Sequence, residues 1–527
     1  MIDKGRLTAV KSDFIDIFTL KKDELGGSWL TAFVVFAFLI RLPLIFFPEG
    51  IYNDGVEYIR TAKYILAGNW SEGFVPPVYP ALIAVLNLIV KDFELAGILA
   101  SVFFGAVLVL PVYYFTKEVF DTRTACVAAL FTVFHPLLFA YSGSVLTEST
   151  YYFFVAMIAF LGWLAFARGR LFHIVLFSFF SSLAYLTKPE GVGFLFVFLL
   201  WVISINPPGN EKRLIRSRLR ISVVALVSFI IFSLPYLVQM KRDLGTWEIS
   251  KKASISLWAS QQNVEDGGDE TVPQFPKRRV DIFTLIKNPF SLLARICFGL
   301  FDALLKFQQG LTPYLFLFAI IGFLRKRDNN YPWKPNLYIL SNILFFFGFV
   351  LPFFWITKRH TSHMIPMVLP WVACGFLIIV SWSYEKFKTR HMKRNKFNAL
   401  CLVVIMLALL TQGVLSTGRG HRQVQKDVGL WMRANLPGDA KFMSRLPQEG
   451  FYAQMPWARI RKTTYSEILI EARSQGANYL VIDDVILKNV KDFRENMAGG
   501  DLFLIKEWEK DHRNIFLFKI VPSFSSS

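Results

Sequence analysis

The chain has 527 residues, of which 54% are hydrophobic and only 18% are charged, a composition that excludes an ordinary soluble protein. The formal net charge is +19, but the basic residues gather in short loops between long apolar runs. In that setting basic residues orient spans in a bilayer, so no nucleic-acid partner is assigned. The runs are about 18–22 residues long, enough to cross a hydrocarbon core of roughly 30 Å. The sequence predicts a polytopic α-helical membrane protein.

The apolar runs define the expected spans in chain order. The first run carries Arg41 and has no small-residue cleavage site, so it is expected to stay as a span and not to be a signal peptide. We expect about eleven transmembrane helices, at roughly residues 29–47, 95–115, 123–141, 149–167, 171–187, 190–206, 221–240, 305–324, 337–356, 364–383 and 398–415.

Two further apolar stretches do not fit a simple span. The stretch "PPVYPALIAVLNLIV" at 76–90 is short, which favours a re-entrant or interfacial helix. The stretch at 288–307 is amphipathic, and charged residues interrupt it, so we expect it to lie along the membrane interface. Those interruptions are Arg295, Asp302 and Lys306.

Basic loops give the expected orientation. "ARGR" at 167–170, "EKRLIRSRLR" at 211–220, "RKR" at 325–327 and "EKFKTRHMKRNK" at 385–396 all fall on one side if the N-terminus is cytoplasmic. Positive charge in short loops marks the cytoplasmic side, so we expect a multi-pass plasma-membrane protein with this orientation. The segment after residue 415 is then extracytoplasmic.

Two expected external loops, about residues 48–94 and 241–290, are too long to be plain connectors. The second contains "NVEDGGDETVPQFP", which we interpret as a lid. The tail, 416–527, alternates helical and strand patterns and is expected to form a small extracytoplasmic α/β domain, separate from the membrane domain at 1–415. It begins with the amphipathic "VQKDVGLWMRANLPGD" and ends in the expected hairpin "LFLIKEWEKDHRNIFLFKIV".

Several common chemistries lack their motifs. The tail has neither a P-loop nor a dinucleotide glycine fingerprint, so no nucleotide is assigned. The four cysteines form no CxxC pair, which argues against metal or disulfide roles. They are Cys126, Cys297, Cys374 and Cys401.

A pair of acids follows the first span. In "YNDGVEYI", Asp54 and Glu57 are three residues apart, a spacing that places both on one face of a helix. The pair is consistent with ordinary solvated charge. However, apolar neighbours such as Tyr58 at a membrane edge raise a carboxyl pKa, which suits a general base.

Other polar residues are expected on the same external side. Glu148 stands at the mouth of the fourth span, and "LTKPEG" places Lys188 and Glu190 in an external loop. A cation in such a loop suits a phosphate ligand. Pairing of Lys188 with Glu190 or Glu148 is the alternative.

"TKRHTSH" adds more cations to the external side, among them Lys358 and Arg359. His360 and His363 are three residues apart, which is a weak metal signal because two histidines do not complete a site.

Five stretches, in order along nearly the whole chain, resemble the prokaryotic relatives of protein O-mannosyltransferases and of the lipid A aminoarabinose transferase. These enzymes are integral-membrane glycosyltransferases of the GT-C fold. The stretches are "IYNDGVEYIRTAKYILAGNW", "HPLLFAYSGSVLTESTYYFF", "LAYLTKPEGVGF", "KRHTSHMIPMVLPWVACGF" and "WMRANLPGDAKFMSRLPQEGFYA".

The resemblance implies a polyprenyl-phosphate sugar donor, an acceptor on the external face and, typically, inversion of configuration. The acceptor is a lipid, a polysaccharide or a protein. The resemblance assigns the general base to Asp54 and an assisting role to Glu57. A divalent metal is left open as a cofactor.

The remaining site residues also follow from the resemblance. Glu148, Tyr58 and Glu190 are expected to line the acceptor side of the cavity. Donor phosphate is expected at Lys188, Arg359 and His360, although many relatives have Tyr where this chain has His360.

Two other classes remain open. A lipid or sugar transporter places charged residues inside its spans, for which Arg41 and Asp302 are the candidates here. An O-antigen ligase or polymerase uses a diphosphate-linked donor, and it usually has a large external loop late in the chain and no soluble α/β tail.

Overall fold

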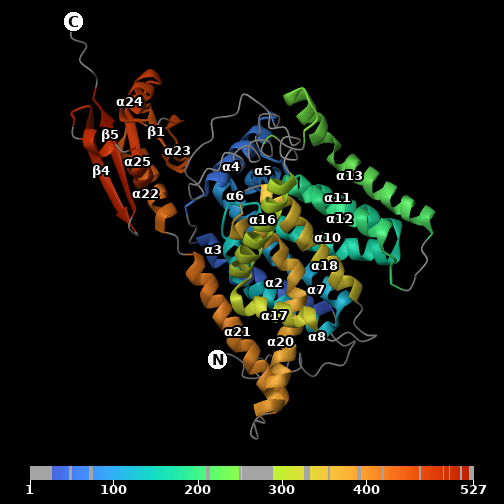
Figure 1. Cartoon of the computed structure of the whole chain (residues 1–527). Coiled ribbons are helices and arrows are strands. Elements are labelled where there is room, and N and C mark those ends of the chain that lie inside the picture. The colour runs from blue at the N-terminus through green and yellow to red at the C-terminus, as the bar shows by residue number, and fades with distance from the viewer. Residues whose placement is uncertain are drawn as a thin grey trace. The chain divides into compact units, whose positions relative to one another are not determined.

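A computed structural model of the chain describes residues 27–46, 50–69, 75–208, 214–248, 251, 289–325, 333–353, 356–387, 393–417, 420–461, 464–490, 492–497, 499–510 and 513–521 (Figure 1). The expected lid "NVEDGGDETVPQFP" lies outside these residues. The chain divides into two compact units. The first comprises Met1–Phe47, Thr61–Gln262 and Lys277–Ser416, and the second comprises Pro48–Arg60, Asn263–Pro276 and Thr417–Ser527.

The secondary-structure elements described in the first unit are all helices. Its helices, in order, are α2 (Gly27–Arg41), α3 (Pro43–Phe46), α5 (Val78–Val90), α6 (Phe93–Val107), α7 (Val109–Val119), α8 (Thr122–Phe134), α9 (Pro136–Ser142), α10 (Glu148–Arg168), α11 (Leu171–Tyr185), α12 (Val192–Ser204), α13 (Ile215–Leu244), α16 (Pro289–Leu311), α17 (Pro313–Leu324), α18 (Trp333–Phe345), α19 (Lys358–Thr361), α20 (Ile365–Phe387) and α21 (Arg394–Thr417). Helix α4 (Asn53–Leu66) crosses the division between the units.

Each of the eleven apolar runs expected to span the membrane contains a helix. By length and composition, six helices in the described part of the chain can cross a membrane, or up to eight if each of two bent pairs is one span. The count of about eleven is therefore not confirmed, because several helices are shorter than a bilayer requires. The short run at 76–90 is α5, and its re-entrant placement stays a prediction. The chain is a multi-pass membrane protein.

Helices α17 and α20 pack closely through a pair of glycines. A Cβ added to Gly322 would lie 2.0 Å from the carbonyl oxygen of Trp371, and one added to Gly375 would lie 1.9 Å from that of Phe318. Small residues let membrane helices approach until their backbones touch, which gains van der Waals contact where lipid supplies no hydrophobic driving force.

A proline breaks the helical run after α8, and Arg41 compensates for it. Pro136 has no N–H, so the carbonyl of Thr132 loses its partner within the helix. The Arg41 guanidinium donates to that carbonyl at 3.4 Å, to Ser142 Oγ at 3.1 Å and to the Ala37 carbonyl at 3.0 Å. Arg41 is fully buried. These contacts give it a structural role, which weakens its reading as a transport residue.

The second break corrects an expected boundary. Helix α16 continues to Leu311, and the chain then bends by 108° at Thr312 into α17. The expectation of a span starting near residue 305 is therefore wrong. The reason is local: Pro313 lacks an amide hydrogen and disfavours helix at the residue before it. Thr312 lies outside the helical region, with φ at 76°.

The tail folds as a five-stranded sheet with strand order β2-β1-β3-β5-β4. The first three pair in parallel, whereas β5 is antiparallel to β3 and β4. This confirms the expected hairpin and the α/β class. The strands are β1 (Phe442–Ser444), β2 (Trp457–Arg459), β3 (Tyr479–Asp483), β4 (Leu502–Lys510) and β5 (Arg513–Ile520).

Helices cover both faces of this sheet (Figure 1). Along β3, Tyr479 and Val481 pack on one face and Leu480 and Ile482 on the other, as strand periodicity requires. The first face carries α22 (Gly420–Asn435) and α23 (Gln448–Ala453); the second carries α24 (Tyr465–Ser474), α25 (Asp484–Asn489) and α26 (Phe493–Asn496).

A buried carboxyl lies in the tail on α23. Glu449 is 3% exposed, and its Oε2 atom has no hydrogen-bond partner. Burial raises the pKa of the Glu449 carboxyl to about 8, because removing water disfavours the charged form. Asp483, which forms an ion pair with Arg445 at 2.6 Å between Nη2 and Oδ2, raises this pKa further, whereas Arg445 lowers it.

The glycine contact between α17 and α20 predicts a large effect of a small substitution. Gly375→Ala should lower the free energy of unfolding by about 1–3 kcal/mol, because the added methyl forces the two backbones apart. Gly348→Ala is the matched control, since a Cβ there meets nothing within 4 Å. The measurement is unfolding of the detergent-solubilised protein by increasing SDS. Equal stability of the two variants would contradict the close approach.

The buried Glu449 carboxyl predicts a pH-dependent stability. Between the unfolded pKa of about 4.3 and the folded pKa of about 8, only the unfolded chain releases this proton, so stability falls as pH rises, by up to about 1.4 kcal/mol per pH unit. Glu449→Gln should remove this slope and be the more stable form at pH 8. Thermal unfolding across pH 5–8 checks it, with the exposed Glu509→Gln as control. An unchanged slope in Glu449→Gln would show that another group carries the pH dependence.

Candidate functional site

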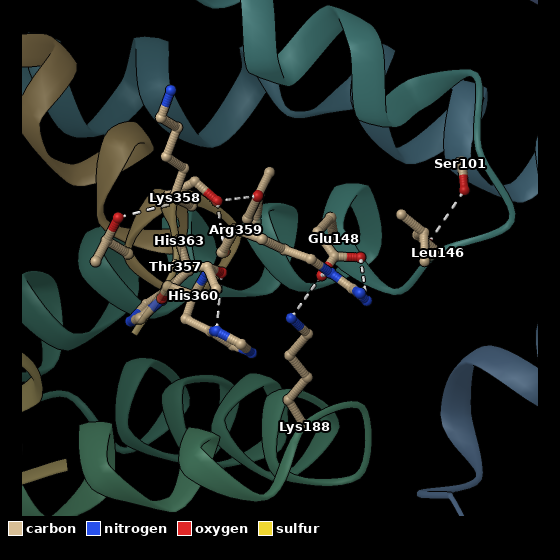
Figure 2. Close-up of polar contacts among 12 residues, drawn as sticks. Ser101, Leu146, Glu148, Lys188, Thr357, Lys358, Arg359, His360 and His363 are labelled. Carbon is tan, nitrogen blue, oxygen red and sulfur yellow. Dashed lines mark hydrogen bonds and ion pairs between the residues drawn. The ribbon is translucent and has the colours of Figure 1, made fainter. Parts of the chain in front are cut away.

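Three of the expected site residues form one ion cluster in the first unit, shown in Figure 2. The Lys188 Nζ atom lies 2.8 Å from Glu148 Oε1, and the Arg359 Nε atom lies 2.5 Å from the same oxygen. Arg359 Nη2 also donates to Glu148 Oε2 at 3.3 Å. The structure therefore pairs Lys188 with Glu148, one of the two partners that the sequence left open. Two cations and one anion leave the cluster with a net charge of +1.

Burial differs sharply within the cluster. The Glu148 side chain has no exposed surface, whereas Lys188 is 14% and Arg359 23% exposed. A carboxylate removed from water needs paired charges and hydrogen bonds to remain ionised. Part of each cationic side chain is therefore exposed, whereas the carboxylate that pairs with both of them is not.

Local sequence explains how each side chain reaches the cluster. Glu148 lies in the first turn of α10, where the helix dipole favours an acid. Lys188 precedes Pro189, which disfavours the helical region at the residue before it. Lys188 is accordingly extended, with φ at −144°. The turn Pro189–Gly191 then returns the chain toward α11, and a Cβ on Gly191 would lie 2.5 Å from the main chain of Ala184.

Arg359 comes from the short helix α19, which Thr357 caps. The Thr357 side chain accepts from the His360 amide, and its Oγ1 atom lies 3.0 Å from His360 Nδ1. Farther along, Ser362 Oγ donates to the Arg359 carbonyl at 2.7 Å and pairs with the hydroxyl of Tyr152 on α10. These contacts tie the segment bearing Arg359 to the helix bearing Glu148.

The two histidines have different surroundings. His363 is buried, its Nδ1 atom lies 2.6 Å from the His360 carbonyl, and its ring packs against Phe346, with centroids 5.1 Å apart. His360 is half-buried beside Thr357. Within the described ranges, no group of three or more His, Cys, Asp or Glu residues is placed to hold a metal ion.

Sequence reasoning did not single out two aromatic neighbours of this cluster. Tyr151 and Tyr152 follow Glu148 on α10 and are fully buried. The ring centroid of Tyr151 lies 5.5 Å from Lys188 Nζ, a cation–π contact. Their hydroxyl groups, which lie in an otherwise apolar expected span, were the feature of the sequence from which these two residues could have been identified. Glu190 lies on the turn that follows Lys188 and is half-buried.

The remaining expected residues lie on α4 in the second unit. Asp54 is in the first turn of this helix and is half-buried, and Glu57 forms a 3.0 Å ion pair with Arg60. Tyr58 is buried, with 4% of its surface exposed. The spacing of the two acids is therefore helical. These residues belong to the second unit, whereas the ion cluster belongs to the first.

Comparison with known proteins identifies the fold. Residues 75–237 match the model of the dolichyl-phosphate-mannose-protein mannosyltransferase family. No curated protein sequence matches the chain significantly.

Two solved structures are similar over most of the chain. ArnT from Cupriavidus metallidurans bound to undecaprenyl phosphate is 11% identical, with a TM-score of 0.56 over 95% of this chain and 99% of that one. The Archaeoglobus fulgidus oligosaccharyltransferase tethered to an acceptor peptide with the NVT sequon is 16% identical, with a TM-score of 0.57 over 87% and 69%. At these identities the likeness is one of fold, and it is the GT-C fold that the resemblance implied.

Proposed function

We propose that this chain, which has the fold of the GT-C membrane glycosyltransferases, moves a monosaccharide from a polyprenyl-phosphate donor to an acceptor on the extracytoplasmic face. The observation that carries the proposal is the ion cluster, in which Lys188 and Arg359 are partly exposed and keep one net positive charge beside Glu148. Arg and Lys groups of this kind suit a phosphate. The bound undecaprenyl phosphate of the similarly folded ArnT structure supports the same ligand class.

The proposed reaction is a single displacement. A hydroxyl or amine of the acceptor attacks the anomeric carbon while the bond from that carbon to the phosphate oxygen breaks, so configuration inverts. The polyprenyl phosphate leaves with the bonding electrons, and the acceptor proton passes to the base. Lys188 and Arg359 stabilise the charge that develops on the leaving phosphate, and His360 is a further donor to it. No nucleotide-binding domain is needed because the donor is a lipid.

Asp54 is the proposed general base, with Glu57 assisting in holding the acceptor. Support comes from the position of Asp54 in the first turn of α4, partly shielded from water, since a carboxyl in such a place is suited to proton transfer. Tyr58 and Glu190 are assigned to the acceptor side of the cavity. Glu148 is assigned a positioning role, because both of its oxygens engage the two cations.

The basic loops support an orientation with a cytoplasmic N-terminus and an extracytoplasmic tail in the plasma membrane. Experiments that test the proposal use membranes as the source of acceptor and vary the lipid-linked donor.

Replacement of the proposed base gives the first functional test. Asp54→Asn keeps size and polarity but cannot take a proton at neutral pH, so transfer should fall at least about 100-fold. Glu57→Gln should lose less than about tenfold. The measurement is transfer of radiolabelled sugar from a polyprenyl-phosphate mannose or aminoarabinose donor in membranes, at matched expression.

The outcomes of this test separate the classes of function. Full activity of Asp54→Asn would exclude it as the base. Transfer by the wild type from a diphosphate-linked donor, and from no monophosphate donor, would favour the ligase or polymerase class. Movement of intact lipid across the bilayer without any sugar transfer would favour a transporter.

The second test concerns the donor phosphate. Arg359→Gln should weaken binding of undecaprenyl phosphate about 10–100-fold, as expected for loss of about 1.5–3 kcal/mol from a charged hydrogen bond. Lys358→Gln is the matched control, because Lys358 is the adjacent cation, is exposed and points away from Glu148 in Figure 2. Binding is measured by thermal shift and tritiated-lipid retention. Equal weakening by both variants would indicate a general effect of surface charge.

A further inference from the structure

The short segment that enters α4 has its partners in the tail. Gly50, Ile51 and Tyr52 immediately precede the helix that begins at Asn53, so they are joined directly to its first turn, which contains Asp54. The tail and this segment belong to the same compact unit, although about 370 or more residues separate them in sequence. Three consecutive residues of the segment each contact the tail.

Arg422, in the first turns of α22, holds two of the three. Its Nε atom donates to the Gly50 carbonyl at 3.2 Å, and its guanidinium carbon lies 3.8 Å from the centroid of the Tyr52 ring. Arg422 is 6% exposed. Burial lowers the pKa of Arg422 to about 10, so the guanidinium still carries its charge at neutral pH and the cation–π contact is retained.

Tyr452, on α23, contacts the third residue of the segment, Ile51. The Ile51 amide donates to the Tyr452 hydroxyl at 2.8 Å, and both residues are buried. A buried amide that loses its partner costs free energy, so this bond resists displacement of the segment. The Tyr452 side chain also makes a cation–π contact, with the Lys426 ammonium 5.2 Å from the centroid of its ring.

Two glycines allow these contacts. A Cβ on Gly50 would lie 2.1 Å from the carbonyl oxygen of Arg422, so the main chain of the segment lies directly against the main chain of α22. A Cβ on Gly429 would lie 2.6 Å from Tyr452 Cβ, so α22 and α23 are close enough to contact the segment together. Only glycine fits at either position without displacing backbone.

We infer that the tail is part of the catalytic apparatus, and that Arg422 and Tyr452 are positioning residues that fix the first turn of α4 and thereby Asp54. This inference rests on the proposed function for the role of Asp54. If the tail only packed against the rest of the protein, losing one of these groups would not affect catalysis. Under this inference, loss of the Tyr452 hydroxyl or of the Arg422 guanidinium changes the placement of Asp54. The catalytic residue remains Asp54, and the tail acts through it.

Hydrogen exchange in the full-length protein tests the contact independently of catalysis. Tyr452→Phe removes only the hydroxyl that accepts the hydrogen bond from the Ile51 amide. Arg422→Gln removes the guanidinium, and with it the hydrogen bond to the Gly50 carbonyl and the cation–π contact with the Tyr52 ring. Both should raise the exchange rate of peptides covering residues 50–60 at least tenfold. Tyr465→Phe and Arg473→Gln are the matched controls, because they remove the same groups from α24 of the same domain. Among the described residues, Tyr465 contacts Asp492 and Phe493, and Arg473 contacts Asp501 and Val521, so neither contacts residues 50–52.

Kinetics tests the positioning role. Tyr452→Phe and Arg422→Gln should lower kcat for sugar transfer about tenfold or more while leaving the KM for the lipid donor within twofold, since the donor phosphate is bound elsewhere in the chain. Arg422→Lys, which keeps the charge but not the planar guanidinium, should recover part of kcat. The two control variants should retain wild-type kcat.

The outcomes distinguish this inference from the proposed function. Unchanged exchange at residues 50–60 in both variants overturns the contact. Raised exchange with unchanged kcat overturns the positioning role, as does an equal fall in kcat in the control variants. Full activity of Asp54→Asn instead overturns the assignment of the base, and the exchange data would still decide whether the tail holds the segment.

Discussion

Glu148 imposes the constraint on which the membrane unit depends. A carboxylate without exposed surface is stable only when charged partners replace the water it has lost. Those partners come from two other places in the chain: the turn after α11 supplies Lys188, and α19 supplies Arg359. Satisfying one buried charge therefore brings three segments together. It also leaves two cations partly exposed, which is the chemical basis for the proposed phosphate-binding role.

The same unit shows how irregular backbone is tolerated in an apolar environment. Where Pro136 interrupts the run of helix, the carbonyl it frees receives a hydrogen bond from Arg41. Without such a donor, an unpaired carbonyl at membrane depth would be costly. Arg41 shows that a charged residue inside a span is not by itself evidence of transport. Its guanidinium N–H groups donate to nearby carbonyl and hydroxyl oxygens and stabilise the fold.

Local patterns made much of the architecture predictable. Apolar runs mark the helices, and alternation marks β3 and the terminal hairpin, because these features follow from which side chains must be buried. The resemblance to known transferases indicated Asp54, Glu148, Lys188 and Arg359. Reasoning from local pattern misplaced the boundary at Thr312, where a proline after an apolar helix makes a bend and not a new span. It also missed Arg422 and Tyr452, whose partners lie hundreds of residues away.

By itself, the sequence determined that the chain is a multi-pass membrane protein with an α/β tail, since length, apolarity and periodicity are properties of each segment alone. It also placed Asp54 and Glu57 on one helical face, because a three-residue spacing is a local matter. Tertiary structure decided that Lys188 pairs with Glu148 and not with Glu190, and that the tail holds the segment before Asp54. Both outcomes depend on which groups from distant parts of the sequence become partners when charges and backbone polar groups are removed from water. No pattern within a single segment specifies those partners.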